Sequence, residues 1–200
     1  MAGQQQHVEL YRKVALRNRL LSTLGGKPGT AYVPFLGDGD IAAACYQGWT
    51  IFGADIDPAR IPTAQPRLNG ATLKVADCDS WPFPEATQTV FCLADFDAYA
   101  YPYTSFRAFW AATHKAPRMA LVFTDGNKQT IMRQHRLYLP DGTTTAQQSL
   151  NTNEARAAYN FYFVRHVLPW FTEAIKPYRI VDRAFYQRGM MLYWGAVIER

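Results

Sequence analysis

The chain has 200 residues, 48% of them hydrophobic and 18% charged, which is enough apolar material for the core of one ordinary domain. Its net charge of +5 permits an anionic partner such as nucleic acid but does not require one. There is no signal-peptide core, no apolar run near the roughly 20 residues of a membrane span and no CxxC pair, so we expect a soluble cytoplasmic protein with reduced thiols and no membrane partner.

The first predicted element is a helix over Gln4–Leu24. One face of this helix carries an apolar stripe of Leu10, Val14, Leu21 and Leu24. Arg17 interrupts the stripe. Glycine and proline at positions 25–29 end the helix.

A regular rhythm follows. Short apolar runs, each closed by an acid or a glycine, are separated by connecting segments, two of which, Ile41–Gln47 and Phe106–His114, have a helical pattern. The runs are Ala31–Leu36, Thr50–Ala54, Thr72–Ala76, Thr89–Ala94 and Met119–Thr124. Strands that alternate with helices predict a parallel sheet, and ligands of such sheets bind at the carboxyl ends of the strands.

The last third of the chain changes character. Residues 137–153 are polar, with a Pro140-Asp141-Gly142 turn and a run of threonines, and we expect a surface loop or mobile flap there. Glu154–Ile175 again has the pattern of a helix. Two further apolar runs, Arg179–Tyr186 and Met190–Ile198, flank Arg188-Gly189 and predict a terminal hairpin.

The first three strand ends carry groups that suit an adenosine. The FLGDGD turn, Phe35–Asp40, follows the first strand, and its glycines allow backbone to come close to a ligand. Asp55 ends the second strand, where a carboxylate accepts both hydroxyls of a ribose. Asp77 ends the third strand and could accept from the exocyclic amine of adenine.

From about Tyr32 to Ile198 the sequence resembles the class I S-adenosylmethionine-dependent methyltransferases. Gly37-Asp38-Gly39 looks like their GxG, IFGADIDP like their second-strand motif and VADCDSWPF like their third. The resemblance implies a Rossmann-like three-layer α/β sandwich with a mostly parallel seven-stranded sheet and a C-terminal antiparallel hairpin. It also implies one methyltransferase-like domain over 1–200, with an N-terminal helical segment at 1–30.

The same resemblance implies S-adenosyl-L-methionine as the cofactor. The residues that it places on the cofactor are Gly37, Asp38, Gly39, Asp55, Ile56, Asp77, Cys78 and Asp95. Two positions depart from the pattern: Phe35 stands where the family usually has an acid, and Ile41 where it has a third glycine. Asp38 or Asp40 would then contact the amino group of the methionine part.

The segment DFDAYAYPYTSF lies at the end of the fourth strand, which faces the methyl group in this family. It resembles the Asp-Pro-Phe-Gly-Ser-Pro turn of the tRNA guanine-N2 dimethyltransferases, over about residues 92–126. On this match Asp97 takes the place of the acid, Tyr99 of the aromatic and Pro102 of the last proline, whereas Ala98, Ala100 and Tyr101 depart from the pattern. The later Thr124-Asp125-Gly126 resembles a Thr-Asp pair after that family's next strand.

The resemblance implies a catalytic role for Asp97 and Tyr99, with Asp95 as the alternative acid. A carboxylate that accepts the N–H of an exocyclic amine localises its lone pair and stabilises developing positive charge. Tyr101, Pro102 and Tyr103 would then contact a planar substrate, unless the tyrosines are core residues. Arg133 and Arg136 either meet phosphates or form a solvated face, and the histidines have no spacing typical of a metal site.

These features predict a methyltransferase that acts on a nucleobase nitrogen in RNA or DNA. A small-molecule methyltransferase and a non-catalytic binder of nucleotide or S-adenosylmethionine are the alternatives, and Phe35 favours the binder. A nicotinamide-binding domain is a further rival, because Ala42 is tolerated at the last position of GxGxxG. The residues do not indicate an oligomeric state.

Overall fold

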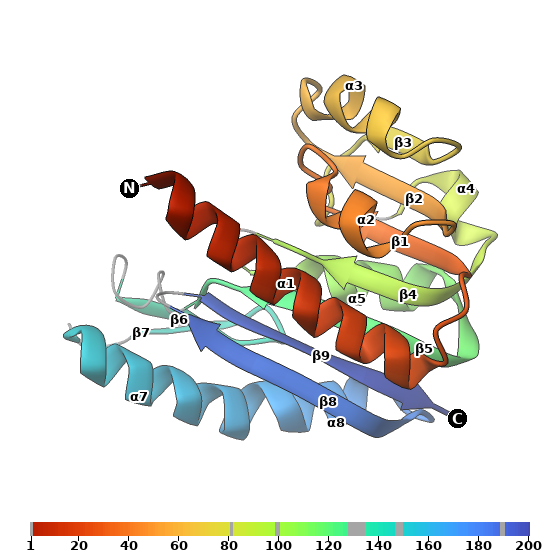
Figure 1. Cartoon of the computed structure of the whole chain (residues 1–200). Helices are drawn as coiled ribbons and strands as arrows, with labels where there is room; N and C mark the ends of the chain where they lie inside the picture. The colour runs from red at the N-terminus through yellow and green to blue at the C-terminus, as the bar shows by residue number, and fades with distance from the viewer. Residues whose placement is uncertain (1, 81, 99–100, 128–134, 147–149, 189–190) are drawn as a thin grey trace.

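The computed structural model describes residues 2–80, 82–98, 101–127, 135–146, 150–188 and 191–200. Its central sheet has the strand order β3-β2-β1-β4-β5-β9-β8 (Figure 1). The strands are β1 (Thr30–Pro34), β2 (Thr50–Asp55), β3 (Thr72–Val75), β4 (Val90–Phe96), β5 (His114–Asp125), β8 (Arg179–Arg188) and β9 (Met191–Glu199). This confirms the predicted Rossmann-like α/β fold.

The sheet is mostly parallel. β1 pairs in parallel with β2 and β4, β2 with β3, and β4 with β5, whereas β9 runs antiparallel to both β5 and β8. β1, β4 and the second half of β5 are mostly apolar runs because both faces of a parallel sheet are covered by helices. The carboxyl ends of β2 and β4 point to the side on which the N-terminus lies (Figure 1).

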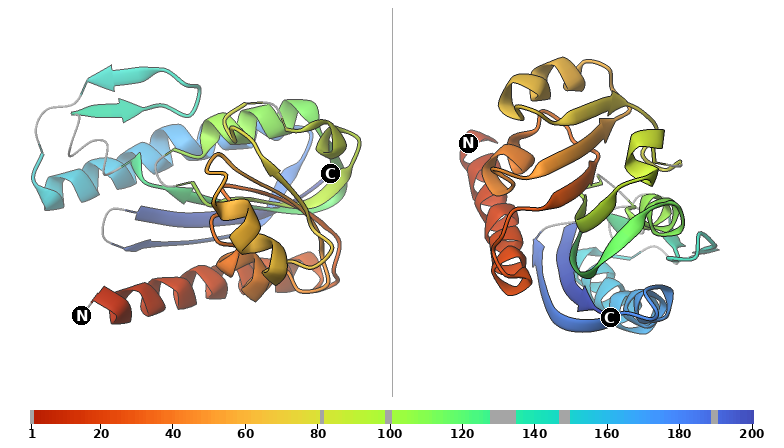
Figure 2. Two further views of the ribbon diagram at one scale, coloured as in Figure 1. Left: turned by 90° about the horizontal axis from the view of Figure 1, so that it is seen from above. Right: turned by 90° about the vertical axis from the view of Figure 1, so that its right-hand side faces the viewer.

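Helices cover the sheet on both faces (Figure 2). One face carries α1 (Ala2–Leu24), α2 (Asp40–Cys45) and α3 (Arg60–Ala64), followed by a 3₁₀ turn over Gln65–Arg67. The other face carries α4 (Pro84–Thr87), α5 (Tyr103–Ala112), α7 (Thr152–Tyr162) and α8 (Leu168–Ala174). A π-helical turn, Phe163–Val167, joins α7 to α8, so the helix predicted over Glu154–Ile175 is confirmed.

Each face has its own apolar core. The core under α5, α7 and α8 is rich in aromatic rings, and in its centre Phe123 stacks on Trp194 and Phe96 at centroid distances of 4.4 and 5.3 Å. The core under α1 and α2 consists mainly of aliphatic side chains such as Leu16 and Leu20. Such stacked pairs add to the burial of apolar area that holds the layers together.

The polar segment after β5 is more ordered than the predicted loop. It contains a small antiparallel sheet of β6 (Arg136–Tyr138) and β7 (Thr144–Ala146). The turn between them closes through Leu139 N to Thr143 O at 2.8 Å and Gly142 N to Leu139 O at 2.9 Å. The threonine run favours a strand because its side chains are β-branched.

In the part of the chain that the structure describes, no helix is both long and apolar enough to cross a bilayer.

Candidate functional site

The glycine-rich turn between β1 and α2 forms one side of the carboxyl edge of the sheet. Gly37 and Gly39 have φ angles of 57° and 79°, in the left-handed region that glycine adopts without strain. Phe35 also has a positive φ, 58°, and its N–H donates to the Cys78 Sγ at 3.2 Å. A Cβ built on Gly37 would meet no described heavy atom within 4 Å, so the space above this turn is open.

Asp55 fastens the turn to the end of β2. Its Oδ2 accepts the N–H of Gly37 at 2.8 Å, and its Oδ1 accepts the N–H of Asp57 at 3.0 Å. The carboxylate is partly exposed, and the adjacent Ile56 side chain is 69% exposed. An acid and an exposed apolar side chain therefore lie next to the open face of the glycine turn.

The other two acids of the turn are paired with arginines. Arg60 donates to Asp38 at 2.8 Å, and Arg67 bonds to Asp40, so both carboxylates are neutralised by the segment after β2. All four side chains are exposed, and such pairs separate at little cost in free energy.

Asp77 and Cys78 follow β3, next to Asp55 across the sheet. The Asp77 side chain is exposed and accepts the N–H of Asp79 at 3.0 Å. Cys78 is buried, and this burial raises the pKa of its thiol to about 12. The structure thus brings Gly37, Asp55 and Asp77 to one edge, whereas the Cys78 side chain points into the core.

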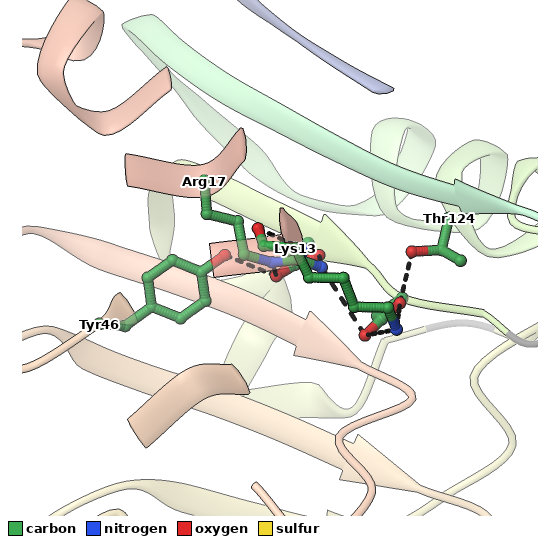
Figure 3. Close-up of polar contacts among 6 residues, drawn as sticks. Lys13, Arg17, Tyr46 and Thr124 are labelled. Atoms are coloured by element: carbon green, nitrogen blue, oxygen red, sulfur yellow. Dashed lines mark hydrogen bonds and ion pairs between the residues drawn. The ribbon is translucent and has the colours of Figure 1, made fainter. Parts of the chain in front are cut away.

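Asp95, inside β4, is fully buried on the α1 face. Arg17 Nε and Nη2 donate to its two oxygens at 2.6 and 2.7 Å, and the Tyr46 hydroxyl donates to Oδ2 at 2.5 Å (Figure 3). Burial on its own lowers the pKa of Arg17, but the carboxylates of Asp95 and Asp97 raise it above its usual value. Asp95 is therefore the centre of a buried ion pair and has no exposed surface for a ligand.

Asp97, one residue beyond β4, is the acid of this corner that keeps some exposure, 13% of its side chain. Lys13 Nζ lies 2.8 Å from both carboxylate oxygens, the Thr124 hydroxyl donates to Oδ1, and Arg17 Nη2 is 3.7 Å from Oδ2. Burial on its own raises the pKa of Asp97, but Arg17, Lys13 and the hydrogen bonds lower it below its usual value. Asp97 is therefore ionised at neutral pH.

The tyrosines after Asp97 have different environments. Tyr103 begins α5 with no exposed surface, and its hydroxyl donates to Asp125 at 2.7 Å, so its place is in the core. Tyr101 is half-buried and donates to the carbonyl of Leu139. Pro102 is buried at the start of α5.

Three other residues were predicted to contact the substrate or to take part in catalysis, namely Arg136, Tyr99 and Arg133. Arg136 is exposed in β6. Tyr99 and Arg133 lie outside the described residues.

Three residues of the corner were missed as site residues by the sequence reasoning, namely Lys13, Arg17 and Tyr46, whereas Thr124 was named only as part of the Thr-Asp pair of the resemblance. Arg17 carried a signal, because a cation on the apolar face of a helix needs a buried acid as partner. Lys13 lies one helical turn before it and on the same side. Nothing in the sequence pairs either of them with the end of β4, because that contact spans 84 residues for Lys13 and Asp97.

No protein-family profile and no curated protein matches this chain. Solved methyltransferase structures match it over almost its whole length. N-methyltransferase NodS from Bradyrhizobium japonicum WM9, in complex with S-adenosyl-L-homocysteine, is 14% identical over 98% of this chain and 86% of its own, with a TM-score of 0.56. The plantazolicin methyltransferase BpumL, also with S-adenosyl-L-homocysteine, is 10% identical over 98% and 87%, with a TM-score of 0.59.

A third match is an S-adenosylmethionine-dependent methyltransferase from Leishmania major, 15% identical over 99% of this chain and 75% of its own, with a TM-score of 0.57. At these identities the likeness establishes the fold, which is that of the class I methyltransferases.

Proposed function

We propose that this protein is an S-adenosylmethionine-dependent methyltransferase and that its acceptor is a nitrogen on a nucleobase in RNA or DNA. We further propose that residues 1–200 act as one methyltransferase-like domain. The observation that carries the proposal is the Asp55 carboxylate, which holds the N–H of Gly37 at 2.8 Å beside the open face of the glycine turn. Structures of this fold have been solved with S-adenosyl-L-homocysteine, the product of methyl transfer.

The residues at this edge fit the nucleoside part of the cofactor. The partly exposed Asp55 can accept ribose hydroxyls, and the exposed Ile56 offers an apolar surface to a purine. The exposed Asp77 can accept from an exocyclic amine. The fit is looser at the amino-acid part, because Phe35 replaces the usual acid, and Asp38 and Asp40 are paired with arginines.

When bound, S-adenosylmethionine supplies a methyl group that its sulfonium has already activated, so a protein nucleophile is not required. The task left to this chain is to align the acceptor and to stabilise charge that develops on it. Asp97 is ionised and lies at the end of β4, where it can accept the N–H of an amine. That hydrogen bond localises the nitrogen lone pair and stabilises the positive charge that develops during transfer.

Three features support a nucleobase as the acceptor. The turn from Asp97 to Pro102 resembles that of enzymes that methylate an exocyclic base nitrogen. The centroids of the half-buried Tyr101 and Tyr138 rings lie 5.8 Å apart, and aromatic rings near the acceptor can stack on a base. The net charge of +5 suits a polyanionic substrate.

Transfer of label from methyl-tritiated S-adenosylmethionine tests the proposal. Purified protein is incubated with RNA, with DNA and with a small-molecule extract, and label is counted in each. We expect label in nucleic acid, at a rate that falls steeply with salt. Asp97→Asn, which keeps the shape of the side chain, should abolish transfer while S-adenosyl-L-homocysteine still binds. A fully active D97N variant would contradict the role of Asp97.

A small-molecule acceptor is the second candidate. The match with NodS, an N-methyltransferase, covers 86% of the NodS chain. A protein of about this size therefore supports N-methyl transfer without a large additional domain. Label in the small-molecule extract, with little dependence on salt, would favour this candidate. Binding of cofactor without transfer to any pool would favour a non-catalytic binder, for which Phe35 is the supporting residue.

A further inference from the structure

Asp95 and Asp97 differ in how firmly their charges are held. Asp95 is bonded by the buried guanidinium of Arg17 and by Tyr46 at 2.5–2.7 Å, and none of its surface is exposed. Asp97 is bonded through both oxygens by Lys13, whose side chain is 21% exposed (Figure 3). A lysine ammonium on a flexible stem is the more readily displaced of the two cations.

Asp97 would keep two partners if Lys13 left. The Thr124 hydroxyl donates to Oδ1, and Arg17 Nη2 lies 3.7 Å from Oδ2. Oδ2 would then lack the donor that lies 2.8 Å from it in this structure. Lys13 itself would regain water, and its Nζ already lies 5.3 Å from the centroid of the Tyr193 ring, a contact that does not involve Asp97.

We propose that Lys13 is a displaceable counter-ion of Asp97. The Lys13 ammonium occupies the position that the N–H of the acceptor amine takes when the acceptor binds. This inference rests on the proposed function, because it assigns Asp97 to the acceptor. An ammonium and an amine nitrogen donate through the same atom type at the same distance, so the Nζ–Oδ2 separation of 2.8 Å marks where the acceptor nitrogen sits. Lys13 is then a positioning residue that sets the affinity for the acceptor.

The position of the Lys13 ammonium on Asp97 also indicates which chemical groups could serve as the acceptor. A neutral amine can replace an N–H donor on Asp97, whereas a carboxylate or phenolate would meet the negative charge of Asp97 once Lys13 has left. The site therefore favours nitrogen acceptors with an N–H over anionic oxygen acceptors.

The kinetic test compares Lys13→Met and Lys13→Arg, with unmodified RNA transcribed in vitro as the acceptor. K13M removes the competing ammonium and keeps the apolar stem, so KM for RNA should fall by about threefold or more while kcat stays within about twofold. K13R keeps a cation that can hold both oxygens, so its KM should equal or exceed that of the wild type. Lys27→Met, the same change at an exposed position beyond the far end of α1, is the control and should alter neither constant.

Either of two kinetic results would overturn the inference. In the first, KM for K13M is unchanged or higher than in the wild type. In the second, kcat of K13M collapses while the variant remains folded by circular dichroism, which would place Lys13 in the chemistry itself.

A spectroscopic readout does not depend on turnover. The ¹H–¹⁵N signal of the Lys13 ammonium, assigned by its loss in K13M, is followed with S-adenosyl-L-homocysteine present while adenosine, cytidine or guanosine is added. We expect these amine-bearing nucleosides to shift the signal, whereas N3-methyluridine, whose base has no N–H, should not. A shift without methyl transfer would overturn the proposed function alone. Transfer to RNA with an unmoved Lys13 signal, or an equal shift with N3-methyluridine, would overturn the role of Lys13 alone.

Discussion

The side chains of Arg17 and Asp95 form a bidentate ion pair, with N–O distances of 2.6 and 2.7 Å, and each is at most 1% exposed. The pair fastens α1 to β4 directly beneath Asp97. Burial of two charges is costly unless each is fully hydrogen-bonded, and here Tyr46 satisfies one more lone pair of Asp95. The ion pair therefore makes the N-terminal helix a part of the candidate site.

Arg17→Met should strongly destabilise the protein, because it leaves the Asp95 charge buried without its partner. We expect the free energy of unfolding to fall by about 3–5 kcal/mol in urea titrations. The control is Arg19→Met on the same helix, which removes a surface pair with Asp182 and should cost less than about 1 kcal/mol. The double variant R17M/D95N should recover part of the loss. Equal losses for R17M and R19M would show that the buried pair does not hold the helix.

The two glycines of the β1–α2 turn should respond differently to alanine. A Cβ on Gly39 would come within 3.1 Å of the Ala64 Cβ and 3.3 Å of the Leu68 Cδ1, so G39A should chiefly reduce stability. At Gly37 only the left-handed conformation opposes the change, at about 1–2 kcal/mol, but the new methyl group enters the open space. G37A should therefore chiefly weaken binding of S-adenosyl-L-homocysteine, measured by calorimetry beside thermal melts. The reverse assignment of the two effects would argue against a ligand above Gly37.

Asp55→Ala should weaken binding of S-adenosyl-L-homocysteine by about 10–100-fold, because hydrogen bonds to a charged group contribute about 1.5–3 kcal/mol. The loss includes both direct contacts with the ribose and the hold on the N–H of Gly37. Asp57→Ala, two residues away on an exposed side chain, is the matched control and should leave the affinity nearly unchanged. If D55A binds as tightly as D57A, the carboxylate does not take part in the site.

Asp125 should make stability depend on pH. Its burial raises the pKa from 3.8 to about 6, although the Tyr103 hydroxyl and the Asn127 N–H lower it in part. Between about pH 4 and 6 the unfolded state releases this proton before the folded state does, so stability falls as the pH rises through this window. The shift corresponds to about 3 kcal/mol.

Asp125→Asn removes this titration while it keeps the size of the side chain. The free energy of unfolding of D125N minus that of the wild type should therefore rise by about 2–3 kcal/mol from pH 4 to pH 7. Taking the difference cancels the other titrating groups. A difference that stays constant with pH would contradict the raised pKa.

The order of the strands in the central sheet and of the longer helices could be predicted from the sequence, because these elements have local apolar patterns. β1, β2 and β4 were visible as apolar runs with a polar stop, and α7 with α8 as one helical pattern. The β6–β7 hairpin was predicted as loop, because its strands have three residues each and only Leu137 among them is buried, which is too little for an apolar pattern. Residue types thus identified the longer elements, whereas the short helices α3 and α4 and the β6–β7 hairpin were not predicted.

The candidate site could be predicted only in part, because some of its contacts join segments that are far apart along the chain. Asp55 and Asp77 follow strands that are neighbours in a parallel sheet, so their positions at one edge follow from the topology. Which of Asp95 and Asp97 is buried depends on Arg17 and Lys13, which belong to a helix about 80 residues away along the chain. A contact of that kind has no local signature. It requires the packing of α1 against the sheet.

Calorimetric titration of the wild-type protein with S-adenosyl-L-homocysteine, and in parallel with NAD, tests the central claim most directly. The account predicts one S-adenosyl-L-homocysteine bound per chain with a micromolar Kd, and no heat of binding with NAD. Saturable binding of NAD, or no heat with S-adenosyl-L-homocysteine from a protein that is folded by circular dichroism, would contradict it.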